Sequence, residues 1–177
     1  MIFAAVRRLS TPLQTALHKA LQASLAEYQP PLEVNEFLRD KGYSLVDSHS
    51  GGALSLQRTV GRKKVELRMY LPENYEQIRF DVQITTQDLN KTACFSCIAA
   101  EKEFSISGMS VKTQEDTEEP PSFDFATMDD EFKAAAVSYL QSLGVDSEFL
   151  DILPVVIGDK HNRTYIDFLT SLKDVIS

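Results

Sequence analysis

Acidic side chains are concentrated in one stretch of this 177-residue sequence, and carboxylates at such density attract positively charged ligands. Residues 113–131 hold eight acids and no Lys or Arg. The acids are Glu115, Asp116, Glu118, Glu119, Asp124, Asp129, Asp130 and Glu131. The whole chain has 26 acids and 18 bases, so its net charge of −8 resides in this stretch. Such clustering speeds the encounter with Lys- or Arg-rich segments. The stretch therefore predicts a surface for basic partners; the alternative is a solvated loop that keeps the protein soluble.

The same acids lack the spacing of a calcium site, and the cysteines lack that of a zinc or redox site. Calcium loops place oxygen ligands at fixed steps around a Gly turn, whereas this stretch has no Gly and contains Pro120 and Pro121. Cys94 and Cys97 form a C-x-x-C. A structural zinc site needs four ligands, and a redox pair precedes a helix in a βαβ unit. We expect two buried structural cysteines, no metal and no cofactor.

No residues with the spacing of a catalytic site occur. His18, His49 and His161 lie in three different predicted elements, none beside a nucleophile motif. There is also no Gly-rich phosphate loop. We therefore expect a protein that is not an enzyme. A second hypothesis is direct RNA binding through "GRKK" at 61–64 and a polar sheet face, although the net charge argues against a broad basic face.

Hydrophobic periodicity predicts the fold that must present the acidic stretch. Leu13, Leu17, Leu21 and Leu25 recur every four residues and predict a helix over 11–28. From residue 43 the period becomes two. Strand-like runs cover 43–49, 53–60, 63–71, 78–86, 92–100 and 103–111. The segment "SFDFA" predicts a seventh strand, with Phe123 and Phe125 on one face. The short links between the runs indicate antiparallel neighbours in a meander.

A helical period returns after the acidic stretch. We expect a helix over 127–144 that Thr127 caps, a shorter helix over 146–158 that Pro154 disturbs, and a last helix over 159–177. Expected core positions are Phe132, Ala136, Tyr139, Leu140 and Leu143, then Tyr165, Ile166, Leu169, Leu172 and Ile176. The fold class is α+β: one large twisted antiparallel sheet of about seven strands, flanked by an N-terminal helix and two to three C-terminal helices.

The N-terminal segment differs in composition from the rest. Residues 1–26 contain no acid but include Arg7, Arg8, His18 and Lys19. An acid-free, Arg-bearing amphipathic segment is typical of a mitochondrial presequence; a plain amphipathic helix is the alternative. We expect residues 1–10 to be a targeting remnant and 11–177 to form a single domain. No apolar run reaches the ~18 residues of a membrane-spanning helix, so we expect no integral membrane association.

The order of elements and the C-terminal sequence resemble the mitochondrial glycoprotein family, the acidic matrix proteins that include the receptor for the globular heads of complement. The run "MDDEFKAAAVSYLQSLGVDSEFLDIL" is similar to the family's acids, amphipathic helix ending in Tyr-Leu, Gly turn and short helix. The run "DKHNRTYIDFLTSLKDVI" is similar to its final helix. The resemblance covers about residues 11–177. Pro154 departs from the family's unbroken short helix, and the acidic insertion is shorter than in some relatives.

The resemblance implies an assembly and a role. Family members are ring-shaped homotrimers without known catalytic activity, so it implies a homotrimer here, sealed by the apolar stripes of the first and last helices. The stripe residues are Leu13, Leu17, Leu21, Leu25, Tyr165, Leu169 and Leu172. It also implies an adaptor or chaperone of the mitochondrial matrix that binds basic RNA-binding or ribosomal proteins. Such a protein would support mitochondrial RNA processing and translation, and would contact nucleic acid at most indirectly.

Overall fold

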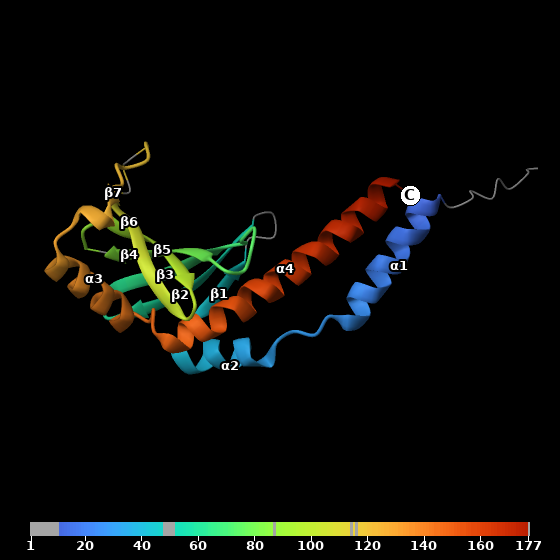
Figure 1. Cartoon of the computed structure of the whole chain (residues 1–177), viewed down its shortest axis with the longest axis horizontal. Helices are drawn as coiled ribbons and strands as arrows, with labels where there is room; N and C mark the ends of the chain where they lie inside the picture. Colours follow the sequence, from blue (N-terminus) through green and yellow to red (C-terminus); the bar gives the residue numbers. More distant parts are fainter. Residues whose placement is uncertain (1–10, 48–51, 87, 114, 116, 177) are drawn as a thin grey trace, which may run out of the picture. The chain divides into compact units, whose positions relative to one another are not determined.

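The computed structural model describes residues 11–47, 52–86, 88–113, 115 and 117–176 (Figure 1). Two helices precede a run of strands, and a short 3-10 helix and two further helices follow it. The elements are α1 (Pro12–Glu27), α2 (Leu32–Lys41), β1 (Ser44–Asp47), β2 (Ala53–Val60), β3 (Lys63–Tyr70), β4 (Ile78–Thr86), β5 (Lys91–Ala100), β6 (Glu103–Thr113), β7 (Phe123–Asp124), η1 (Phe125–Thr127), α3 (Asp130–Ser142) and α4 (Ser147–Ile176). The chain divides into two compact units, Pro31–Gly158 and the paired segments Met1–Pro30 and Asp159–Ser177.

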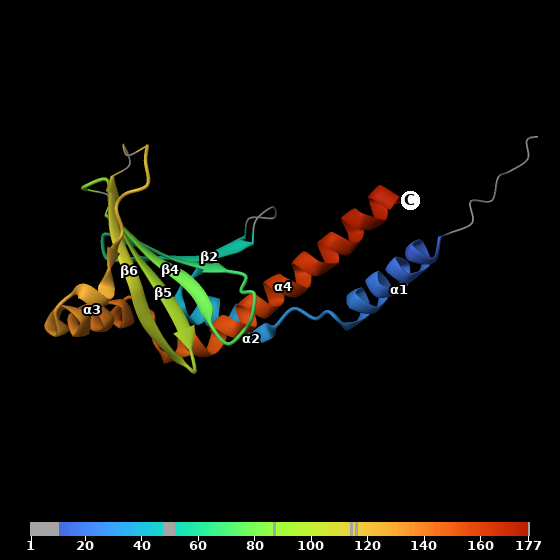
Figure 2. The same ribbon diagram turned by 45° about the horizontal axis from the view of Figure 1, so that its top comes forward.

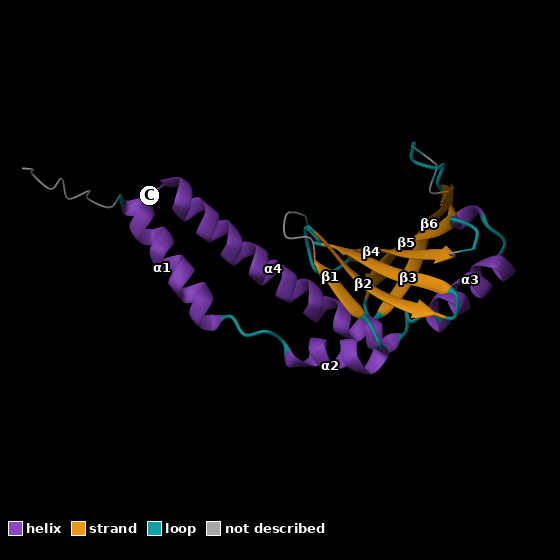
Figure 3. Ribbon diagram, turned by 180° about the vertical axis from the view of Figure 1, so that it is seen from behind, coloured by secondary structure: helices purple, strands orange, loops and turns teal. Residues whose placement is uncertain are grey.

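The larger unit contains a seven-stranded sheet in the order β1-β2-β3-β4-β5-β6-β7, with every neighbour antiparallel (Figure 3). This is the predicted meander, and the observed strands match most of the predicted ranges to within two residues. The sheet is twisted (Figure 2). One irregularity interrupts the pairing of β5 with β6, between Ser96 and Cys97. The α+β class with its antiparallel sheet is therefore confirmed.

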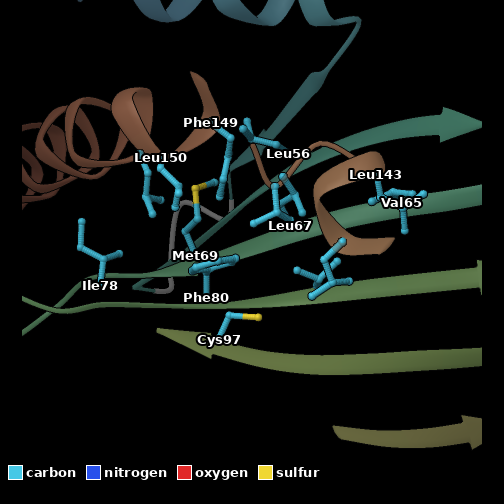
Figure 4. Packing of buried hydrophobic residues seen from close by; sticks show 14 of the residues in the cluster. Leu56, Val65, Leu67, Met69, Ile78, Phe80, Cys97, Leu143, Phe149 and Leu150 are labelled. Carbon is cyan, nitrogen blue, oxygen red and sulfur yellow. The ribbon is translucent and has the colours of Figure 1, made fainter. Parts of the chain in front are cut away.

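One face of the sheet is covered by helices, and the core lies between them. Alternate residues of β3 and β4 are buried, as a period of two requires. The helical side of the core comes from α3 and the first part of α4. Phe149 of α4 meets Phe80 of β4 edge to face, with ring centroids 5.4 Å apart. Figure 4 shows Phe149 directed toward the strands, close to Met69 and Phe80. Ala136 and Leu140 of α3 are buried in the same cluster, so α3, which contains the end of the acidic stretch, is held against the core.

Arg58 joins three elements at one edge of the core. Its Nη2 donates to the Leu143 carbonyl at 2.6 Å, at the end of α3, and its Nη1 donates to the Lys41 carbonyl at 3.4 Å, at the end of α2. Its guanidinium also lies 4.8 Å from the centre of the Tyr43 ring. A cation is favourable at the negative ends of two helices. The close approach leaves no room for a side chain at residue 144, which is Gly with φ +111°.

The smaller unit pairs α1 with the second part of α4, side by side in Figures 1 and 2. Thr11 and Gln14 form a reciprocal capping box at the start of α1. Leu17 and Leu21 are buried against Leu169. The Gln14 side-chain amide donates to the Ile176 carbonyl at 2.6 Å. The start of α1 therefore meets the end of α4, and the two helices run antiparallel.

The C-terminal helices differ from the prediction. The two helices expected over 146–158 and 159–177 are one helix, α4, which contains Pro154. The helix also contains Gly158. Relative to Ala, a Pro inside a helix lowers stability by about 3 kcal/mol and a Gly by about 1 kcal/mol. Buried apolar residues on both sides of Pro154 offset these costs, among them Leu153 and Ile157, which are 1% and 0% exposed. Burial of the helix therefore outweighs the local signal to stop.

The segment between β6 and α3 also differs. Asp129, not Thr127, caps α3; the Thr127 hydroxyl donates to the Asp124 carbonyl. Phe123 and Phe125 do not share a face, because β7 ends at Asp124 and the chain turns into η1: Phe123 is exposed and Phe125 buried.

Three aromatic residues expected in the core are partly exposed. Among the positions predicted there, Ala136, Leu140, Leu143 and Leu169 are buried. Ile166, Leu172 and Ile176 are half-buried, whereas Phe132, Tyr139 and Tyr165 are 42%, 37% and 46% exposed. The helical periodicity predicted the position of the buried face of each helix correctly, but it overestimated how wide that face is.

Candidate functional site

The first part of the acidic stretch, residues 113–124, is held at both ends by the sheet. It leaves β6 at Thr113 and returns to the same strand when β7 pairs Phe123 with Met109 and Asp124 with Gly108. The chain then passes through η1 into α3. Figure 1 shows the segment between β6 and β7 projecting from the sheet. The acids are thus presented on a folded unit rather than on a terminal tail.

Four glutamates of the stretch have no side-chain partner among the described residues. Glu115, Glu118, Glu119 and Glu131 are exposed. The part of the chain that the structure describes offers none of the four a hydrogen bond or ion pair. Asp116 lies outside the described residues. Exposed carboxylates without a partner among the described residues are available to a basic segment of another protein.

Three of the four aspartates of the stretch also have structural roles. Asp124 Oδ1 accepts a hydrogen bond from the Ala126 amide at 2.9 Å, and Asp129 Oδ1 accepts one from the Phe132 amide at 2.8 Å. Asp130 lies 3.6 Å from Lys133 Nζ, one turn along α3. Acids at a helix start satisfy free amides and interact favourably with the helix dipole. All three remain exposed, so their negative charge still adds to that of the glutamates.

An exposed aromatic side chain lies among these acids. Phe123 is 58% exposed, whereas Phe125 is buried with its ring centroid 6.3 Å from that of Phe132. The alternation in "SFDFA" predicted both phenylalanines on one face, which is wrong. The signal was weak, because β7 is only two residues long.

The basic turn is largely engaged within the chain. Arg62 pairs with Asp88 at 3.5 Å, and Lys63 Nζ donates to the Tyr139 hydroxyl at 2.8 Å while lying 5.1 Å from the centre of that ring. Lys64 is exposed. Two of the three bases therefore already have partners, which weakens the case for an RNA contact at this turn.

The cysteines are buried thiols. Cys97 is 2% exposed and Cys94 half-buried, and neither forms a disulfide. Burial raises the pKa of Cys97 to about 12 and that of Cys94 to about 11. Because the thiolate is the species that binds metals and attacks disulfides, neither side chain is prepared for that chemistry at neutral pH. Within the described residues, no group of three His, Cys, Asp or Glu side chains could hold a metal ion.

The two histidines that the structure describes lie on different helices. His18 is exposed in α1 and His161 in α4. His49 lies outside the described residues. A helix both long and apolar enough to cross a membrane does not occur in the described ranges.

The proposed trimer-interface residues fall into two groups. Leu17, Leu21 and Leu169 are buried inside one chain, where α1 packs on α4, with Leu172 partly buried beside them. Leu13, Leu25 and Tyr165 are 58%, 56% and 46% exposed. The first group stabilises the helix pair itself, and the second group is available to a neighbour.

A polar network that sequence analysis missed joins the same two helices. The Tyr28 hydroxyl donates to Asp159 Oδ1 at 2.9 Å, and Arg163 Nε donates to Asp159 Oδ2 at 2.9 Å. Burial and the Asp159 carboxylate raise the pKa of Tyr28. The four-residue spacing of Asp159 and Arg163 on a helix is a readable signal, but Tyr28 lies far away in the sequence.

Comparison with known proteins identifies the family to which this chain belongs. A family model described as mitochondrial glycoprotein matches residues 68–176, from β3 to the end of α4 and well over half of the chain. The chain belongs to the mitochondrial glycoprotein family. The family is a mitochondrial one. The match includes the acidic stretch and both C-terminal helices. The predicted resemblance is confirmed.

Two solved structures share the fold of this family member. One is a hypothetical protein from Leishmania major, described as a sequence homologue of the human p32 protein; its TM-score is 0.72 at 15% identity, over 93% of this chain and 97% of that one. The other is the p22 protein of Trypanosoma brucei, with a TM-score of 0.70 at 16% identity, over 93% and 97%. None of the curated protein sequences matches the chain.

Proposed function

We propose that this protein is a non-catalytic, acidic adaptor of the mitochondrial matrix that binds basic proteins electrostatically. The observation that carries the proposal is a set of exposed glutamates without partners among the described residues: Glu115, Glu118 and Glu119 on the segment that β6 and β7 hold at both ends, and Glu131 at the start of α3. Dense carboxylates raise the association rate of Lys- or Arg-rich segments and select them over acidic ones. Membership of a mitochondrial family supports the compartment.

The proposal includes a homotrimer and a chaperone role. Leu13, Leu25 and Tyr165 remain exposed on the helix pair, and apolar side chains of this size favour a protein partner. Three copies would present three acidic stretches to one partner, and linked sites bind more tightly than single ones. Partners of this kind are RNA-binding or ribosomal proteins, which the adaptor would shield from RNA until needed. In this way it would support RNA processing and translation.

The test is a comparison of captured proteins from mitochondrial lysate. One variant carries Glu115→Gln, Asp116→Asn, Glu118→Gln and Glu119→Gln. The matched control removes four exposed charges elsewhere, with Glu27, Glu33, Glu36 and Glu73 each changed to Gln. Both change the net charge from −8 to −4, so only the position of the lost charge differs. Each sample is divided, and one half is treated with ribonuclease.

We expect basic proteins to be captured by the wild type and the control, with or without ribonuclease, and to be lost from the stretch variant. Equal capture by all three proteins would refute the proposal. Loss of capture after ribonuclease would favour the RNA hypothesis instead. In that case Arg62→Gln and Lys64→Gln should reproduce the loss.

A further inference from the structure

A groove in the larger unit lies beside the β5–β6 turn. It is formed by two adjoining hollows of ≈ 180 Å³ and ≈ 320 Å³, which share Lys102 and Leu150 in their linings. Its apolar lining comes from strands and helices together, with Ala99 from β5, Val137 from α3, and Leu150 and Leu153 from α4. The groove runs along the first turns of α4, on elements that the core fixes in place.

The groove is distinct from the acidic stretch. Its turn precedes β6, whereas the acidic stretch begins where β6 ends, at Thr113. With 11 residues, β6 spans roughly 34 Å at about 3.4 Å per residue. One partner can therefore contact both surfaces only if it bridges that distance.

The rim of the groove is strongly negative. Its lining includes five acids, Glu76, Glu101, Glu103, Asp146 and Asp151, against one base, Lys102. Asp146 is engaged as a cap for Phe149 and Asp151 pairs with Lys102. Within the described chain, Glu76, Glu101 and Glu103 are exposed and have no side-chain partner. Outside the acidic stretch the chain is balanced overall, so this local excess is a property of the groove.

We propose that this groove binds an amphipathic basic segment of a partner protein, with apolar side chains on its floor and Lys or Arg side chains against its rim. The inference rests on the proposed function, since the partner is the same class of basic protein, and it adds a second contact. An apolar floor supplies affinity through burial, and rim charges supply orientation and rate. The acidic stretch selects charge alone, whereas the groove selects charge together with apolar side chains.

Lys102 opposes binding to this groove. Its Nζ lies 3.0 Å from Asp151 Oδ1, so the only base in the lining pairs with an acid of the rim. Its backbone has φ +65° and that of Glu101 φ +51°, the left-handed region that Asn tolerates better than Lys. Lys102→Asn therefore frees Asp151 without disturbing the turn, and should tighten binding.

The experiment measures the affinity of a labelled 14-residue peptide of Leu and Lys by fluorescence anisotropy. A control peptide has Ser in place of Leu and the same charge. The protein background carries the four substitutions at Glu115, Asp116, Glu118 and Glu119, which removes the contribution of the acidic stretch. Two variants are made in this background: one carries Lys102→Asn, and the other carries Glu101→Lys together with Glu103→Lys. Both sets of substitutions lie on an exposed turn. Thermal unfolding checks that each variant is folded.

In this background we expect the Leu–Lys peptide to bind and the Ser–Lys peptide not to bind. The two Lys substitutions should raise Kd by about fivefold or more, and Lys102→Asn should lower it about threefold. The proposed groove site would be refuted if the Leu–Lys peptide did not bind, or if it bound the background protein and the two variants made in it with equal affinity. Either result would leave the proposed function intact. The proposed function alone would be refuted if the Leu–Lys peptide bound the groove while the Ser–Lys peptide had the same affinity for the wild type and for the protein with the stretch substitutions.

Discussion

At the scale of single residues, Gly144 is the position where the fold leaves least room. Its φ of +111° is rarely adopted by other residues, and an added Cβ would lie 2.6 Å from Arg58 Nη2 and closer still to the Tyr43 hydroxyl. Arg58 cannot withdraw, because it holds the Leu143 and Lys41 carbonyls. We expect Gly144→Ala to lower the free energy of unfolding by about 2–4 kcal/mol, measured by urea denaturation.

Gly158 provides the matched control. It lies inside α4, and an added Cβ would meet nothing within 4 Å. Gly158→Ala should stabilise the protein by up to about 1 kcal/mol, since Ala favours the helix. Equal effects of the two substitutions would contradict the packing described around Arg58.

Tyr43 links a residue-scale feature to pH. Its hydroxyl is buried without a hydrogen-bond partner among the described residues, and burial raises its pKa to about 12, with Asp146 adding to the shift and Arg58 opposing it. Tyr43→Phe keeps the ring, which stacks on Phe37, and removes an unsatisfied polar group. We expect the variant to be about 1 kcal/mol more stable at neutral pH.

The pH dependence follows from the direction of that pKa shift. Below pH 10 the hydroxyl is protonated in the folded and the unfolded chain. As the pH rises from 10 toward 12 the unfolded chain loses its proton first, so the wild type loses stability. The advantage of Tyr43→Phe should therefore widen above pH 10 in urea titrations. A constant difference across this range would show that the hydroxyl is not buried as described.

At the scale of elements, the sheet could be predicted almost completely from the sequence. Alternation of apolar residues, as in Val65, Leu67 and Met69, depends only on the two-residue period and one buried face, and short polar links fix the antiparallel order. The helix pair could also be predicted from the stripes that include Leu17, Leu21 and Leu169. These signals are local, so one sequence suffices to reveal them.

Elements that depend on tertiary contacts could not be predicted. Pro154 and Gly158 gave a local signal to end a helix, yet buried neighbours such as Leu153 and Ile157 keep α4 continuous. The same limit applies to the candidate site. The acids were visible in the sequence, but the engagement of Lys63 by Tyr139 and the groove beside Lys102 join segments far apart in the chain.

At the scale of the whole molecule, the proposed function assigns different tasks to different surfaces. The acidic stretch attracts basic proteins, the groove beside the β5–β6 turn adds a contact for apolar side chains, and the exposed stripe residues Leu13, Leu25 and Tyr165 serve assembly. Negative charge is concentrated at two places, the acidic stretch and the groove, whereas the rest of the chain has more bases than acids. Electrostatic capture should therefore depend on where acids are removed rather than on net charge.

The most direct test of this claim is the salt dependence of the affinity for a short Arg-rich peptide. Kd is measured by fluorescence anisotropy from low to above physiological ionic strength for the wild type, the variant neutralised at residues 115, 116, 118 and 119, and the control neutralised at residues 27, 33, 36 and 73. At low salt we predict a rise in Kd of about tenfold for the stretch variant and less than about twofold for the control, with the difference disappearing as salt screens the charges. Equal affinities and equal salt dependence for the two variants would contradict the account, because net charge alone would then explain binding.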